Sequence, residues 1–424
     1  MTAHTPRILT DAETNLLEAT PRSDALAGVT EFGLPTRRVE AWHYTDLRAL
    51  MPKGFAPMAE PQMQESKEAL AGHERLMDSI RLPFINGHFS TLRNVQKALE
   101  ADLPKSVTIK ELTAGELSAM SAFGEDKANA VGWINAAFAT SGLSIHIKPN
   151  STVERPLGLS NLFVNAENGV AATRHAVTFK AFSTATIIDR TLGPNDTAYL
   201  NSSVVDLTVE EGANATWIID QEEGDAATRL ARLSVRLEKN ATLTLFVMNA
   251  GGKLVRQELD FVVAGEGAEL NIHGINLIGG EAHIDVTSRI IHEKPNTNAS
   301  ETFRNVATGR ARGVFQGQIK VAQAAQLTDA RMACNTLLLS DDCDFSAKPE
   351  LEIFADDVQC AHGATVTDLE ESYMFYLMAR GISEVNARRM LIRAFVAEVV
   401  EELEAEELVD ALESRVDAWM SVHV

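Results

Sequence analysis

The chain has 424 residues, 45% of them hydrophobic, and a formal net charge of −21. This charge argues against binding to nucleic acid or to an anionic membrane surface, because both of these partners are themselves negative. No stretch reaches the roughly 18 apolar residues of a membrane span, and the first 20 residues lack the apolar segment of a signal peptide. Three cysteines are too few for a disulfide framework, so we expect a cytoplasmic protein.

Residues 1–130 are predicted to form an N-terminal helical domain with irregular connections. Segments such as "DAETNLLEATP" (11–21) and "TIKELTAGELSAMSAF" (108–123) place apolar residues at helical spacing. In "RLPFINGHFS" (81–90), the pair Asn86-Gly87 predicts the turn of a short β-hairpin, because both residue types accept positive φ angles.

Residues 131–366 are predicted to form a mainly β core domain. Short runs such as "HAVTFKAF", "ARLSVRLE" and "AHIDVTSRI" alternate apolar and polar residues, as strands do. A tight turn followed by an alanine and a new strand recurs at spacings of 28, 28 and 27 residues, at Ala185, Ala213, Ala241 and Ala268. Such a period indicates a solenoid whose coils bury their apolar faces on one another, here a β-helix. A β-sandwich is the alternative.

Residues 367–424 are predicted to form a C-terminal helical domain. In "SEVNARRMLIRAFVAEVVEEL" (383–403), apolar residues recur every four positions, and Leu391, Phe395 and Val399 belong to this stripe. An apolar stripe needs a covering surface, which is either the end of the solenoid or another protein. Both interpretations stay open at this point.

The motifs of the common catalytic classes are missing. The sequence contains no G-x-x-x-x-G-K-[ST] phosphate loop, no G-x-S-x-G elbow, no C-x-x-C pair and no H-E-x-x-H segment. We therefore expect no nucleotide site and no enzymatic activity. The acidic pairs Asp341-Asp342 and Asp356-Asp357 leave one alternative, a β-solenoid enzyme that acts on carbohydrate through surface carboxylates.

The segment "DDVQCAHGATV" (356–366) holds the candidate metal ligands Cys360 and His362. In an extended strand, residues two apart face the same side, so the thiol and the imidazole stand next to each other. Both are preferred ligands of iron and zinc, whose sites normally take about four ligands. If this pair binds metal, the remaining ligands are expected from another chain that meets the open edge of the last strand.

The C-terminal half of the chain resembles the SufB/SufD family of iron–sulfur cluster assembly proteins. The resemblance rests on "KPELEIFADDVQCAHGATVTDLEES", on "FYLMARGIS" after it, and on "TDARMACNTLLL" upstream. The segment "GLPTRRVEAWHYTDL" (33–47) is similar to the N-terminal part of the SufD members of that family.

This resemblance implies a right-handed parallel β-helix between two helical domains. It implies a subunit of the SUF scaffold complex that pairs with SufB through the β-helix and binds the ATPase SufC through its C-terminal helices. It further implies that His362, with Cys360 beside it, contributes to a transient iron–sulfur cluster shared with SufB. A homodimer of the isolated chain, and a structural adaptor with no metal role, are the alternatives that we keep.

Overall fold

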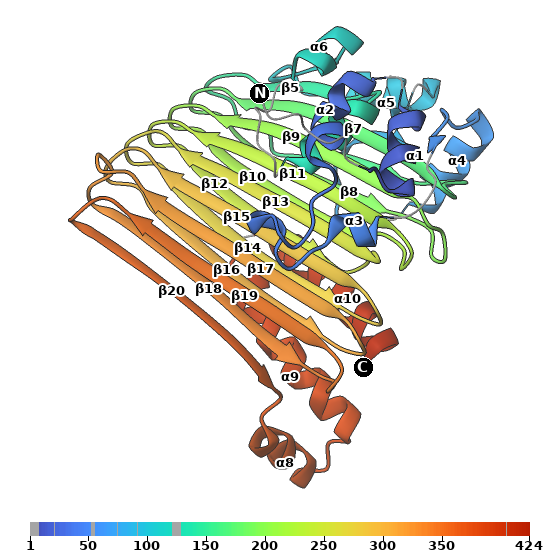
Figure 1. Ribbon diagram of the computed structural model, residues 1–424. Helices are drawn as coiled ribbons and strands as arrows, with labels where there is room; N and C mark the ends of the chain where they lie inside the picture. The colour runs from blue at the N-terminus through green and yellow to red at the C-terminus, as the bar shows by residue number, and fades with distance from the viewer. Residues whose placement is uncertain are drawn as a thin grey trace.

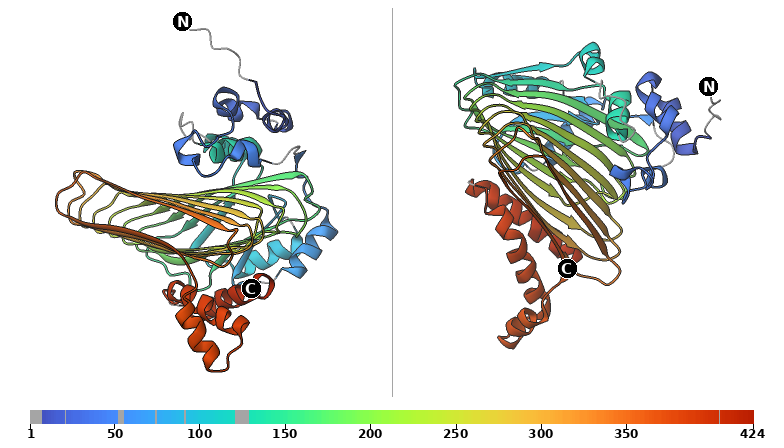
Figure 2. Two further views of the ribbon diagram at one scale, coloured as in Figure 1. Left: turned by 60° about the horizontal axis from the view of Figure 1, so that its bottom comes forward. Right: turned by 60° about the vertical axis from the view of Figure 1, so that its left-hand side comes forward.

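Two parallel β-sheets face each other and form the centre of the molecule (Figures 1 and 2). The computed structural model describes residues 8–20, 22–51, 56–73, 75–90, 92–120, 129–403 and 405–424. The chain alternates between the sheets, so that each coil of a solenoid contributes one strand to each. The prediction of a β-solenoid core flanked by helices at both ends of the chain is confirmed, and the β-sandwich alternative is wrong.

The first sheet, sheet A, has the spatial order β4 (Val107–Glu111), β5 (Leu143–Ile147), β7 (Gly169–Phe179), β9 (Leu200–Val209), β11 (Thr228–Leu237), β13 (Leu254–Val263), β15 (His283–His292), β17 (Arg312–Val321) and β19 (Asp344–Ile353). The two-residue strand β1 (Ala56–Pro57) pairs with β7. Sheet B has the order β3 (His88–Phe89), β2 (Ile80–Ile85), β6 (Leu157–Leu162), β8 (Thr184–Leu192), β10 (Asn214–Glu222), β12 (Thr242–Asn249), β14 (Glu269–Ile278), β16 (Asn298–Ala307), β18 (Thr328–Leu338) and β20 (Val358–Asp368).

Equivalent residues of successive coils stack in straight rows along the solenoid. One inward-facing row of sheet B runs through Ala185, Ala215, Leu243, Leu270, Ala299, Ala330 and Cys360. The coils therefore contain 27 to 31 residues, as the differences between these positions show. Ala213, Ala241 and Ala268 are equivalent, as predicted. The inclusion of Ala185 among them is wrong, because Ala185 pairs with Ala215 instead.

Each coil except the last, whose turn lies between β19 and β20, passes from sheet A into sheet B through one residue with a positive φ angle. These residues are Asn150, Phe182, Gly212, Asn240, Gly267, Asn296 and Leu327. Asparagine and glycine enter this region of backbone space at little cost, which explains the Asn-Ala and Gly-Ala pairs of the sequence repeat. Phe182 and Leu327 are bulky residues in the same strained conformation, and both side chains are exposed.

The N-terminal helices cover the outer face of sheet A (Figure 2). They are α1 (Asp11–Ala19), α2 (Ala27–Phe32), α3 (Leu47–Leu50) and α7 (Ala130–Phe138), while α4 (Met63–Gly72), α5 (Arg93–Asp102) and α6 (Ala114–Ala119) lie at the first coil. Trp42 anchors the connecting segment: its ring is fully buried, with the Arg256 guanidinium 4.4 Å above it. The N-terminal region also contributes strands, because β2 and β4 extend the two sheets past the first coil. Asn86-Gly87 forms the predicted hairpin turn between β2 and β3.

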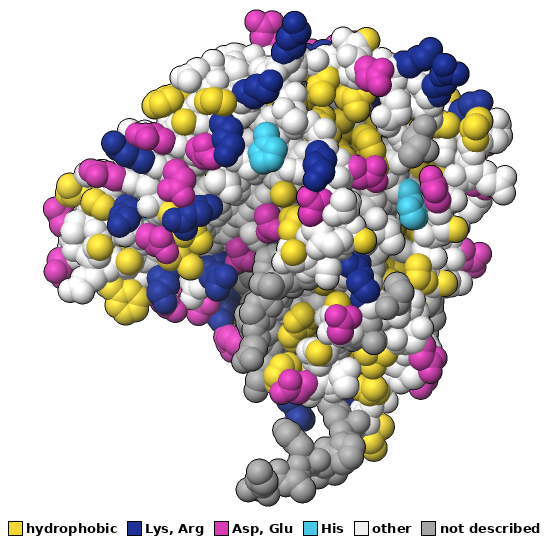
Figure 3. Space-filling model, turned by 90° about the horizontal axis from the view of Figure 1, so that it is seen from above, with side chains coloured by type: hydrophobic (Ala, Val, Ile, Leu, Met, Phe, Trp, Pro, Cys, Tyr) yellow, Lys and Arg dark blue, Asp and Glu magenta, His cyan; other side chains and the backbone are white. Residues whose placement is uncertain are grey.

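The C-terminal helices are α8 (Glu371–Ala379), α9 (Glu384–Val400) and α10 (Glu406–His423). Helices α9 and α10 pack on the outer face of sheet B, where Val396, Val399 and Leu412 join a buried cluster with Phe246 and Ile275. Helix α8 projects away from the sheets (Figure 1) and contributes no buried residue. The face of the molecule seen from above carries acidic and basic side chains side by side (Figure 3).

Candidate functional site

The solenoid ends in two edge strands, β19 in sheet A and β20 in sheet B. Within the described residues, β19 pairs only with β17 and β20 pairs only with β18. Their outer edges therefore present backbone donors and acceptors that a further strand can pair with. We refer to this surface, formed by residues 344–368, as the open end.

Cys360 and His362 lie on β20 and face the interior side of the sheet. Cys360 continues the inward row above Ala330, and His362 stands in register above Met332. In the coil below, these positions are buried, whereas no coil of the described part of the chain covers β20. Cys360 is consequently half-buried against the core, and His362 is exposed to solvent. The two candidate ligands thus share one face, as predicted, at the position where the solenoid stops.

The Cys360 thiol has a raised pKa. Its partial burial is the main cause, and the nearby Asp329 carboxylate adds to the effect, while a hydrogen bond with the Ala330 backbone opposes it. Burial disfavours the thiolate because the charged form loses hydration. The thiol is therefore protonated at neutral pH, and a metal ion has to displace its proton in order to bind the sulfur.

Met332 and Glu301 lie inside the solenoid beneath His362, in the two preceding coils. Met332 lies under His362, where Gly317 on the opposite sheet leaves room for it: a Cβ atom on Gly317 would lie 2.4 Å from the Met332 sulfur. One coil further down, Glu301 is in register with Met332 and is buried, 1% exposed. Its Oε2 accepts a hydrogen bond of 3.0 Å from the Ser288 hydroxyl. Burial raises the pKa of Glu301 to about 7.

The other two cysteines are buried and do not reach the open-end pair. Cys334 accepts a hydrogen bond from the Asn305 amide at 3.3 Å, and burial raises the pKa of its thiol to about 12. The Cys343 thiol donates to the Ser340 carbonyl at 3.0 Å. All three cysteines are free. Both of these thiols are buried.

Exposed apolar side chains surround the open end. Ile353 is the last residue of β19 and Phe354 follows it, Val366 lies on β20, and Leu327 occupies the strained turn before β18. Their separation along the chain hides this patch in the sequence. Its one signal in the sequence is Leu327, a bulky residue at a turn position where most other coils have asparagine or glycine.

The predicted docking residues of the C-terminal helices lie in different environments. Val399 is 1% exposed and packs on the chain's own sheet B, so its side chain is not available to a partner in this conformation. Leu391 and Phe395 are half-buried, and the Arg304 guanidinium lies 5.4 Å from the Phe395 ring centre. One side of the apolar stripe of α9 therefore packs on sheet B, and the other side is partly open to solvent.

Helix α8 carries the most exposed aromatic residues of this region, which the sequence pattern did not single out. Tyr373, Phe375 and Tyr376 are all exposed, Phe375 by 75%. Exposed aromatic clusters of this kind occur at protein–protein interfaces.

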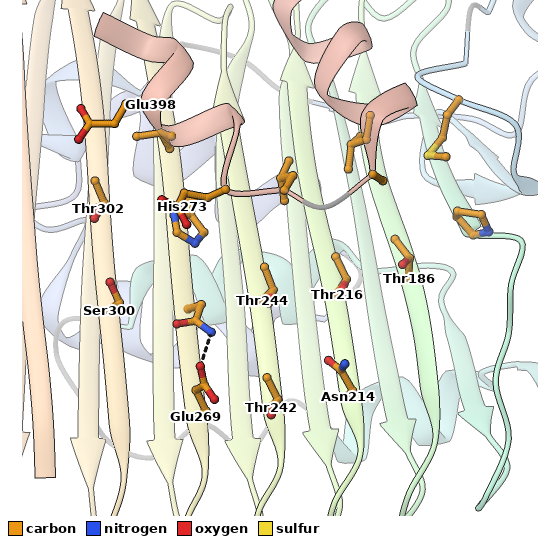
Figure 4. Close-up of a pocket in the computed structure, with 18 of the residues that line it drawn as sticks. Thr186, Asn214, Thr216, Thr242, Thr244, Glu269, His273, Ser300, Thr302 and Glu398 are labelled. Atoms are coloured by element: carbon orange, nitrogen blue, oxygen red, sulfur yellow. Dashed lines mark hydrogen bonds between the residues drawn. The ribbon is translucent and has the colours of Figure 1, made fainter.

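A groove of about 740 Å³ separates the linker between α9 and α10 from the outer face of sheet B (Figure 4). Its floor carries a row of hydroxyl groups from Thr186, Thr216 and Thr244 on neighbouring strands. His273 also lines it, and burial lowers the pKa of this imidazole. The groove lies on the opposite side of the sheet from the side chains of Cys360 and His362.

The described part of the chain contains neither a preformed cluster of metal ligands nor a membrane-spanning helix. No group of three or more histidine, cysteine, aspartate and glutamate side chains there is arranged to hold a metal ion. No helix there is long and apolar enough to cross a membrane.

Comparison with known proteins identifies the family. The profile described as "SUF system FeS cluster assembly, SufBD core domain" matches residues 162–395, and that of the "SufBD protein N-terminal region" matches residues 3–159. The iron–sulfur cluster assembly protein SufD of Escherichia coli is 29% identical over 91% of this chain and 89% of its own length. A SufBD family protein of Synechocystis is 30% identical over 87% of this chain and 84% of its own. SufB of Bacillus subtilis is 26% identical over 65% of this chain and 60% of its own. The chain therefore belongs to the SufBD family of iron–sulfur cluster assembly proteins.

Proposed function

We propose that this chain is a non-catalytic scaffold subunit that pairs with SufB through the open end and holds part of a nascent iron–sulfur cluster there. The observation that carries the proposal is the placement of Cys360 and His362 on the inward face of the last coil, where none of the described residues forms a further coil over them. The three free cysteines and the net negative charge agree with assembly in the reducing cytoplasm.

The ligand count supports a site shared between two chains. Cys360 and His362 supply one sulfur and one nitrogen donor, whereas an iron–sulfur cluster normally takes about four protein ligands. The partner subunit supplies the rest when it covers the open end. The cluster is cargo in this scheme, because separating the two chains removes ligands and releases it.

The edge strand β20 supports pairing by strand addition. Its free backbone groups give hydrogen bonds, and the neighbouring apolar residues Ile353, Phe354 and Val366 give an area that a partner buries. A second copy of this chain offers the same edge, so a homodimer is the form that we expect when SufB is missing.

The C-terminal helices are the proposed docking surface for the ATPase SufC. Because Val399 is buried, contact is assigned to the exposed aromatic residues of α8, with Leu391 and Phe395 at the border of the surface. SufC supplies the nucleotide chemistry for which this chain has no phosphate-loop motif.

The test is cluster loading on the reconstituted complex with His362→Ala. We expect the complex to assemble with normal stoichiometry while bound iron and acid-labile sulfide fall several-fold. Gln359→Ala is the matched control, because Gln359 lies on the outward face of the same edge strand. Normal loading on the His362→Ala complex would contradict the ligand role and favour a purely structural adaptor. Failure of this variant to pair with SufB would instead assign His362 to the contact itself.

A further inference from the structure

A second candidate site lies at the first coil, far along the chain from the open end. Helix α4, the β2–β3 hairpin and the start of α5 surround a hollow of about 800 Å³. Lys67, Arg93 and Lys97 line it, and Glu60 contributes a carboxylate. Among the described residues, no ion pair joins any of these three cations to a carboxylate. An excess of unpaired positive charge gathers here on a chain whose net charge is −21.

Helix α5 begins at this hollow without a side-chain cap. Its N-cap residue is Leu92, which makes no capping hydrogen bond, and its first turn contains no acidic residue. Helix α1, in contrast, begins with the capping box of Thr10 and Glu13. The first backbone N–H groups of α5 have no partner within the helix, and the helix dipole adds partial positive charge. Arg93 in the first turn increases this charge, which only an anion would offset.

Ser90 provides an independent observation at the same place. It lines the hollow, is 6% exposed, and its hydroxyl oxygen has no hydrogen-bond partner in the described part of the structure. An unpaired buried hydroxyl is unfavourable, because the group has lost its hydrogen bonds to water and gained none in the protein. A serine, an uncapped helix start and basic side chains are the groups that together bind phosphate in proteins.

We propose that this hollow binds the phosphate group of a small phosphate ester. The N–H groups of the first turn of α5 and the Ser90 hydroxyl donate to the phosphate oxygens, and Arg93, Lys97 and Lys67 balance its charge. The volume exceeds that of a bare phosphate ion, so the organic part of the ester fits in the same hollow. The proposal is limited to binding.

The experiment measures binding of inorganic phosphate and of ADP to the full chain by calorimetry. We expect saturable binding of both probes, tighter for ADP, that weakens with rising salt. Arg93→Gln with Lys97→Gln should lower the affinity roughly tenfold or more, and Ser90→Ala should lower it several-fold. Lys294→Gln is the matched control, since Lys294 is an exposed lysine in a turn of the solenoid, and it should bind like the native chain.

Three outcomes would overturn the proposal. The first is the lack of saturable binding of either probe. The second is unchanged binding by the Arg93→Gln/Lys97→Gln variant, which would place the anion elsewhere. The third is an equal loss with Lys294→Gln, which would mean that overall charge alone sets the affinity. Arg93 and Lys97 are exposed on α5, so their variants should fold, and the thermal unfolding midpoint checks this.

Discussion

Glu301 is a carboxylic acid inside the solenoid, and its replacement by glutamine should make stability less dependent on pH. Burial raises its pKa from an ordinary value of 4.5 to about 7, opposed only by the hydrogen bond from Ser288. The Cys334 thiol interacts electrostatically with Glu301, and its raised pKa keeps this thiol neutral below about pH 12. No cation pairs with Glu301 in the described residues, so its charged form is stabilised by the Ser288 hydrogen bond but by no positive charge.

The direction and size of this pH effect follow from the coupling between proton binding and folding. The folded chain holds the Glu301 proton more tightly than the unfolded chain, so the free energy of unfolding falls as the pH rises from about 4.5 and levels off above about 7. A difference of about 2.5 pKa units corresponds to about 3 kcal/mol. Glu301→Gln keeps the shape and the Ser288 hydrogen bond but cannot ionise. Relative to the native chain, we expect little change at pH 4.5 and a gain of up to about 3 kcal/mol at pH 8.5.

Urea unfolding of both proteins at several pH values measures this difference. The exposed residue Glu293 gives the control variant Glu293→Gln, which should show no such trend. A pH-independent difference between Glu301→Gln and the native chain would refute the reasoning, because it would mean that the buried carboxyl keeps an ordinary pKa. Comparison at each pH cancels the many other groups that titrate.

Three further changes test other parts of the structure. Asn276 lies between Asn249 and Asn305 in a row of amide hydrogen bonds of 2.8 and 2.7 Å inside the solenoid. Asn276→Ala should therefore lower the free energy of unfolding by about 2 kcal/mol. A loss below about 0.5 kcal/mol would contradict this role. Trp42→Ala should cost about 3 to 5 kcal/mol in unfolding measurements, because the buried ring holds the N-terminal segment on sheet A; unchanged stability would show that the segment contributes little. Phe375→Asp should leave the thermal midpoint unchanged but abolish co-purification with SufC, whereas Phe354→Asp should affect only pairing with SufB; the reverse pattern would exchange the two proposed surfaces.

The coil repeat was predictable because local backbone chemistry repeats with it. Gly212, Asn240 and Gly267 each fill the turn position that needs a positive φ angle, and they mark the start of a strand in the sequence. The predicted equivalence of Ala185 with the other alanines was wrong because this signal is missing there. The turn before Ala185 places Phe182, rather than glycine or asparagine, at the position with a positive φ angle, and the predicted register is shifted by two residues.

The candidate site was predictable only in its local part. Two-residue periodicity places Cys360 and His362 on one face, and this holds for any extended strand. What covers an apolar stripe is not a local property: Val399 and Leu391 look equivalent in the sequence, yet one is buried on sheet B and the other is half-exposed. The basic hollow has the same character, because Lys67, Ser90 and Arg93 come from separate elements that only the folded chain brings together.

The proposed shared site makes a thermodynamic demand on the complex. If the cluster needs ligands from both chains, it binds the paired state more tightly than the separate subunits, and by linkage it must strengthen pairing by the same factor. A loss of one ligand that weakens cluster binding tenfold should therefore remove about 1.4 kcal/mol of this coupling. Without the cluster, the affinity between His362→Ala and SufB should equal that of the native pair, and on supply of the cluster it should rise about tenfold less than that of the native pair. A native pair whose affinity is the same with and without the cluster would show that one chain alone holds the ligands, and the open end would then be a contact surface and nothing more.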